Sequence, residues 1–183
     1  EEIPHAYSLS RYIGIVTQHP HSAWGLETML RDAFRGVPVE VIQCFRRRVR
    51  IPPDQRLCLG QAASRLGIDS ILGEETEDRT GKIRLRIGPV DLATFQGLLP
   101  GSPDHDRLAL LTRLYLQDPL DFDAELVLAR GQARTARLGE STLSRLGLDT
   151  WVFSGGTIGE TSAVFPLQQE AFFHRDGSHD DYR

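Results

Sequence analysis

The chain has 183 residues, of which 40% are hydrophobic and 25% charged, with a formal net charge of −4 and a pI of about 5.9. This composition is typical of a globular protein that can bury a core, and its acidic balance argues against a dedicated nucleic-acid-binding domain. It contains no run of about 18 uncharged apolar residues and its first ten residues have no apolar core, so we expect neither membrane insertion nor a secretory signal.

The cysteines also argue against a secreted protein. Cys44 and Cys58 are the only two, and they form no CxxC motif. We expect two reduced, buried thiols, and hence a cytoplasmic protein, because disulfides belong to oxidising compartments.

The first predicted helix follows HPHSAW, where Ser22 is suited to accept hydrogen bonds at a helix start. Gly36 and Pro38 then end the helix, and VEVIQCF predicts a strand because it is rich in β-forming residues. The apolar residues at helical spacing, which we expect on one buried face, are Leu26, Met29, Leu30, Ala33 and Phe34.

A second strand is predicted around residues 82–87, where apolar and cationic residues alternate. Acidic residues 74–78 and the turn-forming DRTG precede it, so we expect a hairpin in which these acids face the cations of residues 82–86. Gly88-Pro89 is expected to stop the strand.

Two further helices follow. Asp91 is a candidate cap for a short helix, and Ser102, followed by Pro103 and Asp104, is a strong start for a longer one. The residues expected on the buried face of the longer helix are Leu110, Leu111, Leu114 and Tyr115. A strand with nearly the pattern of a half-buried strand is predicted next, in which Phe122, Ala124, Leu126 and Leu128 alternate with Asp121, Asp123, Glu125 and Val127.

An internal similarity links the two halves. SRLGID at Ser64–Asp69 and SRLGLD at Ser144–Asp149 are nearly identical, and a helix, a proline-containing break, a strand and a Leu-Gly pair precede each one. We therefore predict an α+β fold of two tandem pseudo-repeated lobes, each with a helix, a strand, a Leu-Gly/Arg-Leu-Gly turn and a strand. The predicted division is a lead-in (1–22), a first lobe with the hairpin and connecting helix (23–101), a second lobe (102–166) and a polar tail (167–183).

Candidate chemistry is sparse. His19 and His21 flank a proline, but two imidazoles without a third ligand favour an exposed helix entry over a zinc site. Asp121, Asp123 and Glu125 could hold a divalent cation, although alternation favours a solvated strand face. A metal-dependent enzyme on this acidic face stays open as an alternative, while the motifs of a nucleophile elbow, a P-loop and a dinucleotide fold are all missing.

The densest cationic run is RRRVR at residues 46–50. Arginine pairs well with carboxylates at protein interfaces, whereas no aromatic residues lie between these arginines to stack on nucleotide bases. A protein interface is favoured, and a nucleic-acid-associated protein is the alternative. The candidate partner-contact residues are Arg46, Arg47, Arg48, Arg50, Arg84 and Arg86.

Several strings in this order resemble the TssG (ImpH/VasB) family of bacterial type VI secretion baseplate proteins. They are HSAWGLETMLRDAFRGVPVEVIQ, GKIRLRIGPVDLATFQGLLPG, LTRLYLQDPLDFDAELVL and the RLGLDTW that ends at Trp151. The resemblance runs from about Arg11 to Pro166 and suggests a C-terminal portion of a family member, while CFRRRVR is more basic than the family pattern.

The resemblance implies a non-enzymatic protein without metal or cofactor. Family members join TssF, TssE and TssK subunits in a wedge of the baseplate, on which the contractile sheath and tube assemble, in the cytoplasm at an inner-membrane complex. Two similar lobes would let one subunit bind two copies of a symmetric partner, for which a TssK-like trimer is the obvious choice.

Overall fold

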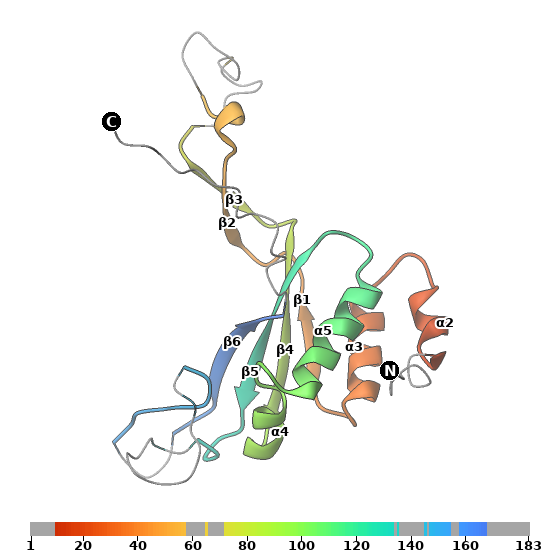
Figure 1. Cartoon of the computed structure of the whole chain (residues 1–183), viewed down its shortest axis with the longest axis vertical. Coiled ribbons are helices and arrows are strands. Elements are labelled where there is room, and N and C mark those ends of the chain that lie inside the picture. The colour runs from red at the N-terminus through yellow and green to blue at the C-terminus, as the bar shows by residue number, and fades with distance from the viewer. Residues whose placement is uncertain are drawn as a thin grey trace, which may run out of the picture.

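The computed structural model describes residues 10–57, 65, 72–133, 135, 145, 147–154 and 158–167. These residues form a mixed α+β fold, shown in Figure 1. The helices are α2 (Ile13–Val16), α3 (Ala23–Ala33), α4 (Leu92–Gly97) and α5 (Pro103–Tyr115), with a 3₁₀ turn at Pro53–Gln55. The strands are β1 (Val39–Ile42), β2 (Arg47–Arg50), β3 (Glu75–Asp78), β4 (Lys82–Val90), β5 (Asp121–Leu128) and β6 (Thr161–Pro166).

Four strands form one sheet in the order β1-β4-β5-β6, and β2 pairs with β3 in a separate two-stranded sheet. In the larger sheet β4 runs antiparallel to β1 and parallel to β5, and β6 runs antiparallel to β5. Parallel neighbours need a crossover connection. The segment that holds α4 and α5 supplies it, because it leads from the end of β4 back to the start of β5.

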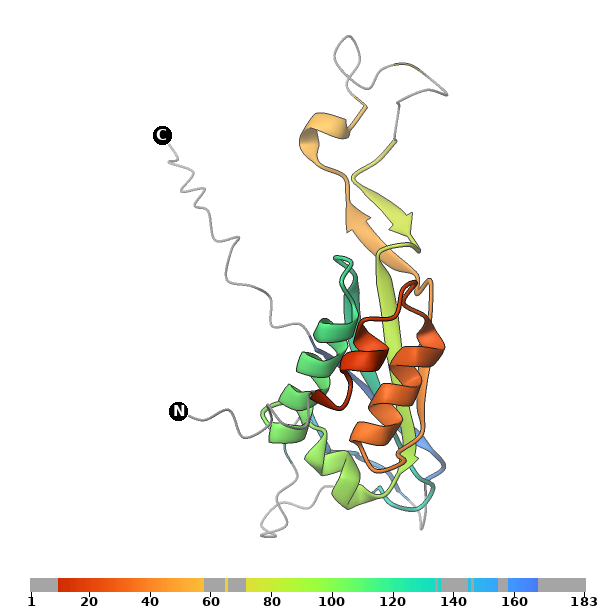
Figure 2. The same cartoon turned by 90° about the vertical axis from the view of Figure 1, so that its right-hand side faces the viewer.

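The helices cover one face of the four-stranded sheet (Figure 2). Alternation along each strand sends apolar side chains toward them, and the register aligns these residues in rows such as Val41, Leu85 and Ala124. All five apolar residues expected on the first helix belong to this core, four of them buried and Phe34 half-buried. The four alternating residues of β5 are buried as predicted.

The three predicted helix starts are confirmed. Ser22 accepts a hydrogen bond from the backbone N–H of Gly25, Asp91 from that of Thr94, and Ser102 from that of His105. Each cap satisfies one of the N–H groups that the first turn of a helix leaves without a partner. The local sequence therefore determines where α3, α4 and α5 begin.

The predicted hairpin between the acidic segment and residues 82–86 is wrong. The acidic residues form β3, whose partner is β2, with Arg47 opposite Asp78, Arg48 opposite Glu77 and Arg50 opposite Glu75. The cationic strand β4 pairs instead with β1 and β5. Opposite charges do face each other across β2 and β3 and across β4 and β5. The basic strand that pairs with the acidic residues is therefore β2, with the sequence RRVR, and not β4.

The predicted stop at Gly88-Pro89 is also wrong, because β4 continues to Val90 through a shift in its register with β5. Gly88 has a φ of 122°, and a Cβ added there would overlap the backbone oxygen of Val127. A glycine permits this irregularity without breaking the strand.

The tandem repeat of two lobes is not confirmed. The strands β1 and β5, one from each predicted lobe, lie in the same sheet on either side of β4. Leu30 and Leu111 are both buried, as equivalent positions require, but Leu110 is 50% and Leu114 41% exposed, so the predicted buried face of α5 is partly wrong. Both Leu-Gly pairs and most of the first SRLG segment lie outside the described residues, as do Ser144 and Leu146 of the second.

A buried tyrosine joins the two long helices. The Tyr115 hydroxyl, near the end of α5, accepts a hydrogen bond from the Ser22 backbone N–H (3.0 Å) and donates one to the Ser22 carbonyl oxygen (2.8 Å). Tyr115 is 3% exposed, and a Cβ on Gly25 would overlap its hydroxyl. The start of α3 and the end of α5 are thereby held together.

We predict that Tyr115→Phe lowers the free energy of unfolding by about 1–2 kcal/mol, because it removes both hydrogen bonds at nearly constant volume. Urea unfolding followed by circular dichroism measures the change. Leu114→Ala, one position away on the exposed side of α5, is the control and should change stability by less than about 0.5 kcal/mol. Equal effects of the two substitutions would contradict this role of the hydroxyl.

Candidate interaction surface

The most distinctive surface is a two-stranded arm, which we define as β2 and β3, residues 47–50 and 75–78. Figure 1 shows the arm projecting from one end of the four-stranded sheet, beyond the layer of helices. It contains three of the six arginines that the sequence suggested as partner contacts, Arg47, Arg48 and Arg50, and Arg46 directly precedes it.

The charges of the arm balance one another. Residues 46–50 carry four arginines, and residues 74–78 carry four acidic side chains. Arg46 forms an ion pair with Glu77, whereas Arg48 and Arg50 are exposed and form no ion pair within the described part of the chain. The arm therefore presents a row of basic side chains beside a row of acidic ones rather than a uniformly basic patch.

Arg47 points the other way along the same strand. Its guanidinium Nε donates to Asp78 Oδ2 at 2.8 Å, and another of its nitrogens binds Asp121 at the start of β5. The side chain is 27% exposed. Arg47 therefore connects the arm to the four-stranded sheet and is less available to a partner than its neighbours.

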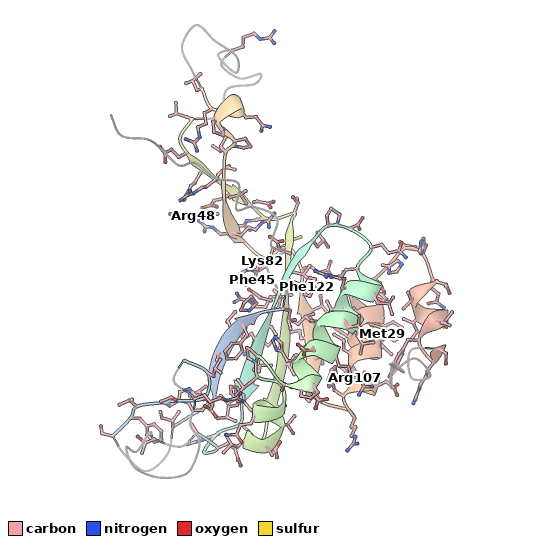
Figure 3. The ribbon with its side chains drawn as sticks, in the orientation of Figure 1. Met29, Phe45, Arg48, Lys82, Arg107 and Phe122 are labelled. Atoms are coloured by element: carbon pink, nitrogen blue, oxygen red, sulfur yellow. The ribbon has the colours of Figure 1, made fainter. Side chains whose placement is uncertain are left out.

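Arg84 is also occupied within the chain, on the sheet face that the helices leave uncovered. It makes a bidentate ion pair with Asp123, with distances of 2.7 and 2.8 Å, and Lys82 Nζ lies 2.7 Å from the same carboxylate. The Phe45 ring covers Arg84, with the guanidinium carbon 3.8 Å from the ring centroid. Phe45 and Lys82 lie where the arm meets the sheet (Figure 3).

Asp123 corrects the expectation of a fully solvated acidic face, because it is only 6% exposed. Burial raises the pKa of its carboxyl group, but hydrogen bonds from Arg84 and Lys82 outweigh burial, and the net pKa lies below the ordinary value. The hydrogen bond that Arg84 donates to Asp123 raises the pKa of Arg84 further. Asp123 and Arg84 thus stay charged and paired at neutral pH.

Arg86 is the one exposed arginine of β4 among the candidates, and its register partners are Glu40 on β1 and Glu125 on β5. The six candidates therefore divide into two sets. Arg47 and Arg84 hold the chain together, while the exposed guanidinium groups belong to Arg46, Arg48, Arg50 and Arg86.

The sequence reasoning missed an apolar surface on the helices. Trp24 on α3 is 75% exposed, and Leu110 and Leu114 on α5 are exposed one turn apart. The sequence of α5 did indicate such a surface, because this helix has more apolar residues than one buried face can hold. Those that are buried are Leu108, Leu111 and Tyr115. Among residue types, tryptophan is enriched at protein interfaces.

A pocket of about 690 Å³ lies near the start of α3, lined by apolar residues such as Leu26 and Leu120 and by both histidines of the HPH string. The His21 ring packs edge-on against Tyr115, with ring centroids 4.6 Å apart, so His21 is not the exposed residue that we expected. Neither of its ring nitrogens has a hydrogen-bond partner within the described residues.

Other observations bear on the alternatives. The described residues include no group of three or more potential metal-ligating side chains that could hold an ion. Cys44 is exposed and free, so the expectation that it is buried was wrong, and Cys58 lies outside the described residues. In the part of the chain that the structure describes, no helix is long and apolar enough to cross a membrane.

Comparison with solved structures shows what this fold is similar to. A cryo-electron microscopy structure of the type VI secretion system TssK-TssF-TssG baseplate subcomplex contains a chain with a TM-score of 0.69 and 20% identity, covering 96% of this chain and 77% of that one. The baseplate complex of the type VI secretion system contains another, with a TM-score of 0.59 and 21% identity, covering 96% of this chain and 51% of that one. The fold is thus that of a chain found in baseplate assemblies. No match was found among curated proteins.

The family follows from the sequence itself. The family model described as "Type VI secretion, TssG" matches residues 1–153. The chain therefore belongs to the TssG family of type VI secretion proteins.

We predict that Asp123→Asn lowers the free energy of unfolding at pH 7 by about 2–4 kcal/mol, because Arg84 and Lys82 lose the carboxylate that neutralises them. Since the folded pKa of Asp123 lies below its unfolded value near 3.8, its contribution is complete above that pH and is lost as the pH falls further. Urea unfolding at pH 7, 5, 4 and 3 should show the difference from the parent shrinking below pH 4. Glu40→Gln, an exposed carboxylate on the same face, is the control; a loss as large as that of Asp123→Asn would contradict the argument.

Proposed function

We propose that this protein is a structural, non-enzymatic subunit of a type VI secretion baseplate, which binds neighbouring subunits in the wedge on which sheath and tube assemble. The observation that carries the proposal is the family match over residues 1–153. The similarity in fold to chains of the TssK-TssF-TssG subcomplex and of the complete baseplate complex supports it.

The proposed partners are proteins of the TssF, TssK and TssE types, in a hetero-oligomer on the cytoplasmic side of the inner membrane. Two surfaces are suited to them. The arm offers exposed arginines and acids that pair with complementary charges, and the helix layer offers Trp24, Leu110 and Leu114 for apolar contacts.

We further propose that the chain binds two copies of a TssK-like trimer through related segments. The helix–strand order recurs as α3–β1 and α5–β5, and the two strands flank β4. This recurrence supports a duplicated unit with the proposed boundaries 23–101 and 102–166. Under this proposal each unit would carry one attachment.

The alternative functions find less support. A metal centre on the acidic face of β5 would need Asp123, whose two oxygens already bind Arg84 and Lys82. A nucleic-acid-binding surface would need an excess of positive charge, but the arginines of β2 lie opposite the acids of β3. A protein interface is the function that remains compatible with both sets of contacts.

We predict that Arg48→Glu/Arg50→Glu, which reverses the exposed charges of the arm, weakens co-purification with TssK-type or TssF-type subunits at least tenfold. Under the two-attachment proposal the mass of the assembly would fall by one partner copy rather than by all of them. Co-expression, affinity purification and mass determination of the complex measure both effects, with circular dichroism to verify the fold.

Arg130→Glu is the matched control, because it reverses one exposed charge just beyond the opposite end of β5. Retention of every partner by the arm variant would argue against the arm as an attachment surface. Loss of every partner from a folded variant would argue against two separate attachments.

A further inference from the structure

The arm and the four-stranded sheet are joined by short connections. Residues 43–46 lead from β1 into β2, and residues 79–81 lead from β3 into β4. Cys44, in the first connection, has a φ of 54°, which turns the chain sharply. Because the arm and the sheet are separate ladders, strand pairing alone does not fix the angle between them.

Arg47 bridges this junction with a single side chain. Its partner Asp78 belongs to the arm, and its partner Asp121 belongs to the sheet. The two carboxylates therefore hold one guanidinium group between two structural units. Planar guanidinium groups are suited to this because their donors lie in a fixed fork.

Asp78 also fixes the second connection. Its Oδ1 accepts hydrogen bonds from the Thr80 backbone N–H and hydroxyl, both at 2.8 Å, and from the Gly81 backbone N–H at 3.3 Å. These contacts from Thr80, followed by Arg47, hold the pKa of Asp78 well below its usual range. The carboxylate that receives Arg47 is thus charged at any physiological pH.

The packing at Gly81 shows how closely Arg47 is fitted. A Cβ at this position would overlap the Arg47 guanidinium and the Asp78 carboxylate. The Gly81 carbonyl oxygen also accepts the backbone N–H of Asp121 at 2.9 Å. The backbone at Gly81 therefore lies against the Arg47–Asp78 ion pair and is hydrogen-bonded to the backbone of Asp121.

The first connection has its own contact with the sheet. The Phe45 backbone N–H donates to the Lys82 carbonyl oxygen at 2.9 Å, and the Phe45 ring stacks on Arg84. Figure 3 shows Phe45 and Lys82 together at the junction and Arg48 farther out on the arm. Both connections are thus held where they leave the sheet.

We propose that Arg47, Asp78 and Asp121 form a clamp that sets the direction in which the arm projects from the sheet. Arg46, one residue earlier, pairs with Glu77 of the arm and, among the described residues, has no ion pair with the sheet, so it has no part in the clamp. An arm with a fixed direction presents its side chains to a partner at a lower cost in conformational freedom than a pivoting arm does.

The clamp can be tested on the protein alone, without any partner, so its failure would leave the proposed function standing. Nitroxide labels are placed at Thr76→Cys on β3 and Ser162→Cys on β6, in a Cys44→Ser/Cys58→Ser background. Both label sites are exposed, one on the arm and one on the sheet. Pulsed electron–electron double resonance then gives the distribution of distances between arm and sheet.

We expect Arg47→Ala to widen this distribution at least twofold and Arg46→Ala, which removes the ion pair with Glu77 of the arm, to leave it unchanged. Asp121→Asn alters only the sheet side of the clamp and should widen the distance distribution as much as Arg47→Ala does. The double variant should be no wider than either single variant, because both substitutions break the same contact.

Arg47→Lys should give an intermediate width, because an ammonium group lacks the guanidinium fork. Narrow distributions in Arg47→Ala and Asp121→Asn, equal to that of the parent, would overturn the proposal. If Arg46→Ala widened the distribution equally, the proposal would also be overturned. The direction of the arm would then depend on ion pairs between its strands and not on the contact of Arg47 with Asp121. If Arg47→Ala fails to fold, Asp121→Asn alone decides, since it leaves every side chain of the arm in place.

Discussion

The parallel pairing of β4 with β5 is the constraint on which the rest of the structure depends. It aligns Ile83 with Phe122 and Leu85 with Ala124 under the helices, and it aligns Arg84 with Asp123 on the opposite face. A parallel pair requires a crossover, so α4 and α5 must lie on the sheet. The same pair also places Asp121 at the edge from which the arm projects, where Arg47 reaches it.

Local features of the fold could be predicted from the sequence because local chemistry determines them. Ser22, Asp91 and Ser102 begin helices by accepting hydrogen bonds from residues three positions later, and the alternation in β5 identifies the four apolar residues that face the helices. The order of several strings along the chain also indicated the family, which no single string could do. The capping and alternation signals act within about ten residues and do not depend on how the strands are arranged.

The remaining features depend on contacts between distant residues. The acidic segment could pair with either of two cationic segments, and charge alone does not distinguish β2 from β4. The burial of Asp123 follows from a register with β4 that no local pattern specifies. In α5 apolar residues occur on two faces, so only the position of the sheet decides that Leu111 is covered and Leu110 is not. The sequence also could not show which arginines are paired within the chain and which are exposed, because their partners Asp121 and Asp123 lie far away in the sequence.

The balance of charge on the arm governs how it acts at a distance. In physiological salt, fields decay over about 8 Å, and an array with equal numbers of opposite charges has little net field beyond that range. The arm therefore does not attract polyanions such as nucleic acid or lipid headgroups from afar. Its selectivity resides in the arrangement of a basic row beside an acidic row, which a partner surface with the complementary arrangement of charges matches once the two are in contact.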